Sequence, residues 1–86
     1  MKDDRGLYFH PYPQNHDVRV YVRQPLVEIE FRLWSRTDPG LWDKHGWVPY
    51  DAIRQAAALY KGRKFDAKRV YDINVARELI ATEEKR

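Results

Sequence analysis

The stretch that decides the fold is DVRVYVRQPLVEIEFRLW, residues 17–34. Two runs of alternating apolar and polar side chains lie on either side of Gln24 and Pro25. A period of two is typical of strands with one buried and one solvent-facing side. Proline lacks the amide proton that a strand ladder needs and suits a turn, so Pro25 marks the reversal. The stretch therefore predicts an antiparallel hairpin over about residues 17–34.

The charged side chains suggest how the two strands are aligned. The predicted alignment places Val22 opposite Val27. Arg19 then faces Glu30 on the polar side, and such a pair contributes roughly 0.2–1 kcal/mol. A hairpin slipped by two residues keeps the same faces but sets Arg19 against Arg32. The first alignment is therefore the predicted register.

Apolar residues at helical spacing follow, and the first set predicts a helix over about residues 49–61. Pro49 suits the first helical position because its fixed φ is already helical. Asp51 in the first turn interacts favourably with the positive end of the helix dipole. Gly62 is typical of a residue just beyond a helix end.

A second helix is expected over about residues 67–82, where apolar side chains from Val70 to Ile80 share one face. Either Asp66 or Asp72 can cap its start. A hairpin and two amphipathic helices each need a surface for their apolar side. The expected fold is an α+β domain of two layers, with the antiparallel hairpin packed against both C-terminal helices.

Two further segments complete the organisation of a chain whose length predicts a single domain, 1–86. Residues 1–16 carry prolines among aromatic residues and are expected to be irregular while lying against the domain. Residues 35–48 form a tryptophan-rich connector between the hairpin and the first helix. A third strand can come from either segment.

The composition limits the chemistry and the compartment. The chain has no cysteine, which excludes disulfides, thiolate nucleophiles, iron–sulfur clusters and cysteine-ligated zinc. It shows no apolar signal segment and no run of apolar residues long enough to cross a membrane. A cytoplasmic protein without membrane contact is therefore expected.

Candidate catalytic and metal-binding groups lack a supporting pattern. The spacing of His10, His16 and His45 matches no metal motif, so no metal is expected. Ser35 stands outside any strand–turn–helix elbow that would make it a nucleophile. Glycine-rich phosphate loops are absent as well. We therefore expect a protein without enzymatic activity or cofactor.

The formal charge of +3 is concentrated in the link between the two helices. Residues 61–69 hold five cations against one carboxylate, a local charge of +4. Such a patch suits either the phosphates of a nucleic acid or an acidic protein surface. The cations of this basic patch are Lys61, Arg63, Lys64, Lys68 and Arg69.

The tryptophans of the connector are the strongest functional signal. Tryptophan is enriched among the residues that anchor protein interfaces. Trp42 and Trp47 are therefore the predicted anchors, with Lys44 and His45 at the rim of the contact. The alternative is that the indoles only enlarge the thin core of a small domain.

These features predict a small non-catalytic protein-interaction module or accessory subunit. An acidic protein surface is the favoured partner, because the basic patch would steer it. The alternative is a nucleic-acid-binding domain that uses the basic link between the helices. A homodimer joined along the hairpin edge is compatible with either function.

Overall fold

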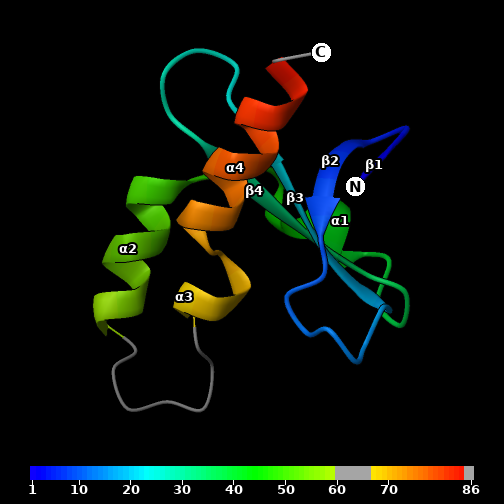
Figure 1. Ribbon diagram of the computed structural model, residues 1–86. Helices are drawn as coiled ribbons and strands as arrows, with labels where there is room; N and C mark the ends of the chain where they lie inside the picture. The colour runs from blue at the N-terminus through cyan, green and yellow to red at the C-terminus, as the bar shows by residue number, and fades with distance from the viewer. Residues whose placement is uncertain (60–66, 85–86) are drawn as a thin grey trace.

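A five-stranded antiparallel sheet forms one layer of the molecule, and its spatial order follows the chain, β1-β2-β3-β4-β5 (Figure 1). The computed structural model describes residues 1–59 and 67–84. The strands are β1 (Lys2–Asp3), β2 (Gly6–Phe9), β3 (Val18–Arg23), β4 (Glu30–Ser35) and β5 (Val48–Pro49). The helices are α1 (Leu41–His45), α2 (Tyr50–Leu59), α3 (Ala67–Val70) and α4 (Ile73–Glu84).

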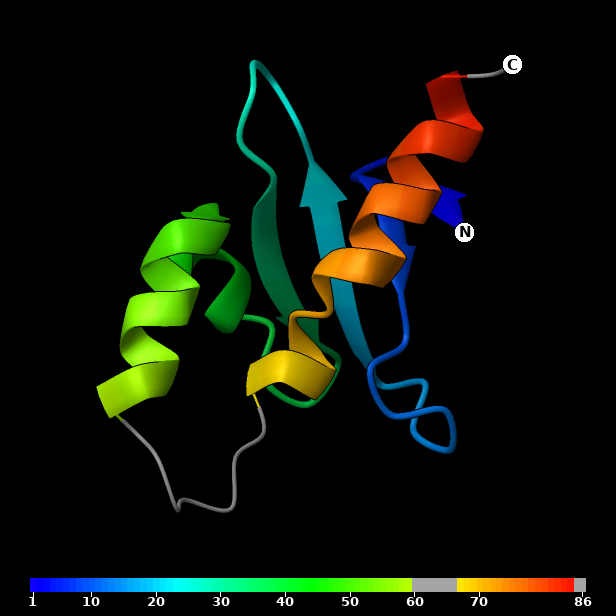
Figure 2. The same ribbon diagram turned by 60° about the vertical axis from the view of Figure 1, so that its left-hand side comes forward.

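The hydrophobic core lies between the sheet and helices α2, α3 and α4. Alternation along β3 turns Val20 and Val22 toward these helices, and both side chains are buried. Helix α4 contacts β2 and β3, and Figure 2 shows it lying along that part of the sheet. This arrangement confirms the predicted α+β fold. The buried core consists of Phe9, Val20, Val22, Ile29, Phe31, Ile53, Val70, Ala76 and Ile80.

The predicted strand register is wrong by four residues. Val22 pairs with Phe31, and Val27 lies outside the strand with 85% of its surface exposed. The chain forms a wide loop over residues 24–29 before β4 begins, because Ile29 takes the core position and its carbonyl accepts a hydrogen bond from the Tyr50 amide. The shift is an even number of residues, so the apolar and polar faces stay as predicted.

The N-terminal segment is only partly irregular, contrary to the prediction for residues 1–16. It contributes β1 and β2, and β2 pairs with the outer side of β3 from Leu7 to Phe9. Gly6, with φ of +129°, closes the tight turn between these two strands. β2 therefore covers the β3 edge of the hairpin, and the homodimer stays a prediction.

The connector of residues 35–48 also contains regular structure. It forms the short helix α1, and Val48 begins the short edge strand β5. In Figure 1, α1 lies behind the strands whereas α4 crosses in front of them. The single layer of helices that the sequence predicted is therefore supplemented by one helical turn on the opposite face.

The second predicted helix is divided into α3 and α4. Asp72 lies between them and caps α4, because its Oδ1 accepts hydrogen bonds from the amides of Asn74 and Val75. The alternative cap, Asp66, lies outside the described residues, as do the last two positions of the predicted helix 49–61. None of the helices within 1–59 and 67–84 has both the length and the apolar character needed to cross a bilayer.

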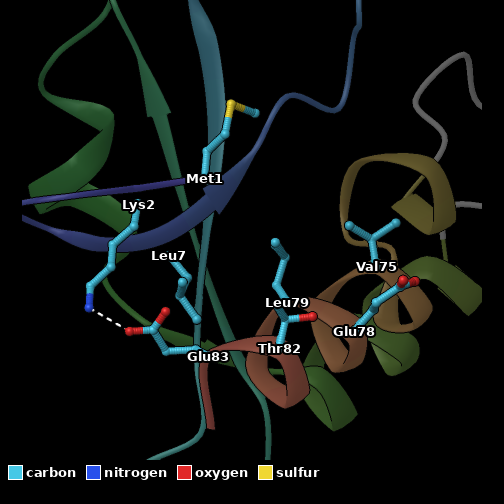
Figure 3. Close-up of a pocket in the computed structure, with 8 residues that line it drawn as sticks. All are labelled: Met1, Lys2, Leu7, Val75, Glu78, Leu79, Thr82 and Glu83. Carbon is cyan, nitrogen blue, oxygen red and sulfur yellow. Dashed lines mark hydrogen bonds and ion pairs between the residues drawn. The ribbon is translucent and has the colours of Figure 1, made fainter. Parts of the chain in front are cut away.

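One ion pair ties the start of the sheet to the last helix. Lys2 Nζ lies 2.7 Å from Glu83 Oε1, so β1 is joined to the final turn of α4 (Figure 3). The pair spans a groove between the two elements.

Candidate interaction site

The sheet face that points away from α2, α3 and α4 is lined by arginines and aromatic rings. Tyr21 of β3 lies beside Tyr8 of β2, with ring centroids 5.3 Å apart, and directly opposite Arg32 of β4. Period-two alternation places all three on the side opposite the core. We call this surface the aromatic–arginine face, and it comprises Arg5, Tyr8, Arg19, Tyr21, Arg23, Arg32, Trp34, Trp42 and Trp47.

Helix α1 brings the two predicted anchors together on this face. The Trp42 ring meets the Tyr21 ring edge to face at 4.9 Å and the Trp47 ring at 6.0 Å. Arg32 holds Trp42 twice: its Nε donates to the Trp42 carbonyl at 2.7 Å, and its guanidinium lies 4.0 Å from the indole centroid. Gly46, with φ of +61°, ends α1 and turns the chain back. Both indoles are half-buried and neither belongs to the core.

Arg23 repeats this arrangement on the second indole. Its guanidinium lies 4.3 Å from the Trp47 ring centroid, and its Nε donates to Glu30 at 2.6 Å. Cation–π contacts of this kind are worth about 0.5–1 kcal/mol at exposed sites. The arginine therefore contacts both the Trp47 ring and the Glu30 carboxylate.

Arg19 lies between two further rings of the face. Its guanidinium carbon is 4.7 Å from the ring centroids of both Tyr8 and Trp34. Nη1 forms an ion pair with Asp3 at 3.0 Å. The buried Nε has no hydrogen-bond partner within the described parts of the chain. Desolvation of this donor is a local cost that the ring contacts offset only in part.

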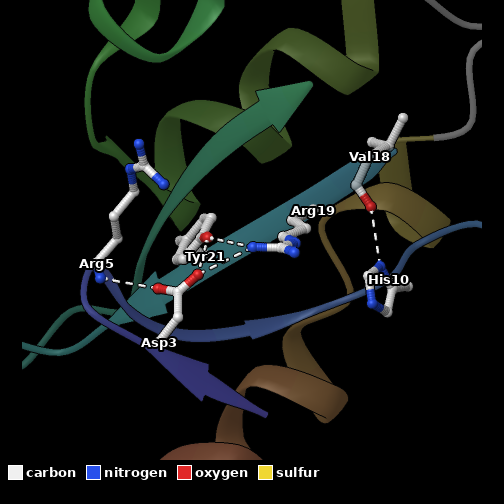
Figure 4. Close-up of polar contacts among 6 residues, drawn as sticks. All are labelled: Asp3, Arg5, His10, Val18, Arg19 and Tyr21. Atoms are coloured by element: carbon white, nitrogen blue, oxygen red, sulfur yellow. Dashed lines mark hydrogen bonds and ion pairs between the residues drawn. The ribbon is translucent and has the colours of Figure 1, made fainter. Parts of the chain in front are cut away.

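A partly buried polar cluster anchors β1 to β3 (Figure 4). The hydroxyl of fully buried Tyr21 donates to Asp3 Oδ2 at 2.5 Å, and the Arg5 amide donates to Asp3 Oδ1 at 2.8 Å. Burial, followed by the bond to Asp3, raises the pKa of Tyr21. Burial also acts to raise the pKa of Asp3, but hydrogen bonds from Tyr21 and the Arg5 amide, with the charge of Arg19, lower it overall. The cluster is therefore an ionised carboxylate held by a neutral phenol and an arginine.

The predicted rim residues lie on the same short helix as Trp42. Lys44 and His45 occupy the last turn of α1, and both are exposed. Asp43 beside them is 91% exposed at its side chain and lies 3.7 Å from Arg32. The structure thus places an exposed polar turn next to the half-buried indoles.

The predicted basic patch is described only in part. Lys61, Arg63 and Lys64 lie outside the described residues, and so does the side chain of Lys68. Arg69 of α3 is exposed, and its guanidinium lies 5.8 Å from the Tyr12 ring centroid. The role of this patch stays a prediction.

Two of the three histidines meet in the loop between β2 and β3. The rings of His10 and His16 stack at 4.2 Å with an interplanar angle of 16°. His10 Nδ1 lies 3.2 Å from the Val18 carbonyl oxygen, which can only accept, so Nδ1 carries the proton. Among the residues that the structure describes, no group of three or more metal-ligating side chains is placed to hold an ion.

The aromatic–arginine face contains residues that the sequence did not single out. Arg19, Tyr21 and Arg23 occupy alternate positions on one side of the predicted hairpin. This spacing was the only feature of the sequence that pointed to a shared face. The spacing was interpreted as a solvent-facing array of ion pairs. The sequence alone does not show that the connector packs on this side of the strands. Comparison of the chain with family models, curated proteins and solved structures gives no match, so the functional argument depends on this geometry.

Proposed function

We propose that this chain is a small, non-catalytic protein-interaction module or accessory subunit that binds a protein through Trp42 and Trp47. The observation that carries the proposal is the position of the two indoles. They lie edge to face at 6.0 Å, half-buried, outside the core and on the sheet face opposite the main helices. Large aromatic residues in such positions are typical of interface anchors.

The surroundings of the indoles support the proposal because they fix the rings before any partner arrives. Arg32 and Tyr21 pack on Trp42, and Arg23 packs on Trp47. Binding then costs little side-chain entropy, which is the main benefit of preorganisation. Exposed Lys44 and His45 supply a polar rim around the anchors.

The charges on this face favour a protein over a nucleic acid. Arg19, Arg23 and Arg32 each form an ion pair with a carboxylate of the same chain. An arginine neutralised in this way contributes less to phosphate binding. The alternative, nucleic-acid binding, then depends on the basic patch, which in the present proposal steers an acidic partner in the cytoplasm.

The proposal is tested by affinity purification from the native host with wild-type protein and three variants. Trp42→Ala and Trp47→Ala should each lose a partner that wild type retains. Leu26→Ala, which truncates a side chain 90% exposed on the β3–β4 loop and outside the aromatic–arginine face, should keep it. Lys44→Glu serves as a second probe of the same surface, because an exposed charge can be reversed without unfolding the chain.

Thermal unfolding of each variant separates binding from stability. Retention of every partner by folded Trp42→Ala, Trp47→Ala and Lys44→Glu would contradict the proposal. Titration with short DNA and RNA at two salt concentrations examines the alternative. Binding that falls steeply with salt and requires Lys64 and Arg69 would replace the protein-interaction proposal with nucleic-acid recognition.

A further inference from the structure

A second surface lies on the opposite side of the sheet, where α4 runs beside β1 and β2. A cavity of about 350 Å³ opens there between the helix and the two strands (Figure 3). Its apolar lining comes from Met1 and Leu7 on the strand side and from Val75 and Leu79 on α4. This groove is separate from the aromatic–arginine face.

The apolar lining of the groove is not sealed by the rest of the chain. Met1 is 57% exposed, and the other three apolar residues, Leu7, Val75 and Leu79, are only half-buried. The Lys2–Glu83 ion pair crosses one end and links the two walls. A groove whose walls are already linked can receive apolar side chains at lower cost in reorganisation.

The rim of the groove on the helix side is acidic. Glu78 lines the groove, is exposed and forms no ion pair with any described residue. Glu83 and Glu84 follow on the last turn, where the carbonyl end of a helix adds partial negative charge. Lys2 and the N-terminal amine of Met1 also lie in the lining, but Lys2 is already paired with Glu83, so Glu78 is the lining carboxylate left without an ion pair among the described residues.

We propose that this groove binds an amphipathic segment of a partner protein in which apolar side chains are flanked by lysine or arginine. The apolar side chains fill the space between Leu7 and Leu79, and a cation beside them pairs with Glu78. This is the helix-in-groove mode of recognition, with charge complementarity setting specificity. Together with Trp42 and Trp47 on the other face, the groove gives the module two separate binding surfaces.

Two labelled synthetic peptides test the groove by fluorescence anisotropy. One has leucines and lysines at helical spacing, and the other has glutamate in place of every lysine. Wild type should bind the lysine peptide at least about tenfold more tightly than the glutamate peptide. Methyl resonances of Leu7, Val75 and Leu79 should shift when the lysine peptide is added.

Three variants locate the contact. Thr82→Trp fills the groove from an exposed position without removing a core side chain, and Glu78→Lys reverses the rim charge. Each should weaken the lysine peptide by about tenfold or more. Asp38→Lys makes the same charge change on an exposed turn elsewhere and should alter binding by no more than about twofold.

The proposal fails if the two peptides bind equally, or if Thr82→Trp binds the lysine peptide as wild type does. Sedimentation measures the oligomeric state. A wild-type dimer that Thr82→Trp converts to monomer would show that the groove binds a second copy of this chain, which would also contradict the proposal. Trp42→Ala should bind the lysine peptide normally. Failure of the groove is therefore distinguishable from failure of the indole site.

Discussion

Tyr21 has a fully buried ring whose hydroxyl would be costly to bury without partners. Asp3 and Arg19 supply those partners and so connect the first strand to the centre of the sheet. A hydrogen bond to a charged group is worth about 1.5–3 kcal/mol. The side chain therefore stabilises the sheet through one hydroxyl as well as through its ring.

Replacement of Tyr21 by phenylalanine should lower the free energy of unfolding by about 1.5–3 kcal/mol, because Asp3 then loses a donor inside the fold. Denaturant unfolding measures the loss. Tyr8→Phe is the matched control, since no described residue bonds to the Tyr8 hydroxyl, and it should change stability by less than about 0.5 kcal/mol. Equal losses for the two variants would show that the hydroxyl of Tyr21 is not specially paired.

The lowered pKa of Asp3 predicts acid sensitivity. A carboxyl group whose pKa is lower in the folded than in the unfolded state stabilises the fold above its unfolded pKa. That contribution is lost as the pH falls through the folded pKa, here below about pH 4. Urea unfolding of wild type from pH 7 downward should therefore show a decline that Asp3→Asn lacks. Asp4→Asn should keep the wild-type profile, and a decline of the same size in Asp3→Asn would contradict the assignment.

Gly46 adopts φ of 61° and ψ of −164°, a conformation almost restricted to glycine. Gly46→Ala should destabilise the fold by about 1–3 kcal/mol through backbone strain alone, since a Cβ there meets no atom within 4 Å. Gly40→Ala is the control, because Gly40 is helical with φ of −66°. Thermal unfolding should show a loss for the first variant only. Trp42 and Trp47 flank this turn, so Gly46→Ala should also weaken partner binding.

At the scale of elements, the hairpin shows what a sequence pattern can and cannot determine. Alternation predicted the two faces correctly, because a slip by an even number of residues leaves each side chain on its own side. The register was wrong because ion pairs form in the observed alignment too, between Arg23 and Glu30 and between Asp17 and Arg36. The wide loop depends on contacts from Ile29 and Glu28 to the start of α2, which local sequence does not reveal.

The observed register predicts unequal roles for two apolar residues that the first alignment buried together. Ile29→Ala should cost about 2–5 kcal/mol, because Ile29 is 7% exposed within the core. Val27→Ala should cost less than about 0.5 kcal/mol, because that side chain is in solvent. Denaturant unfolding compares them directly. Similar losses at both positions would restore the alignment first predicted.

Other elements were predicted to different extents. Asp72 was one of two candidate caps and does cap α4. A third strand from residues 1–16 was left open, but β1 and β2 could not be located because strands of two and four residues give almost no periodic signal. Trp42 and Trp47 were predicted as anchors within the connector; their rings lie 6.0 Å apart in the structure, and their role as anchors stays a prediction. The docking of the connector on Tyr21 and Arg32 is a tertiary contact, so the arginines of the site could not be inferred from spacing.

At the scale of the whole molecule, the sheet separates two surfaces of different chemistry. One face carries indoles held by arginines, and the other carries the core helices and the acidic-rimmed groove beside α4. The proposed anchors and the proposed groove are therefore reached from opposite directions. Trp42→Ala should weaken binding only at the proposed anchors, and Thr82→Trp should weaken binding only at the proposed groove.

The outermost strands of the sheet, β1 and β5, are each two residues long. A neighbouring chain that paired with β1 or β5 would find only two residues of strand to bond with, so extension of the sheet from these two strands is disfavoured. Contacts with other proteins at these two strands therefore depend on side chains and not on backbone pairing, and side chains can distinguish one partner from another.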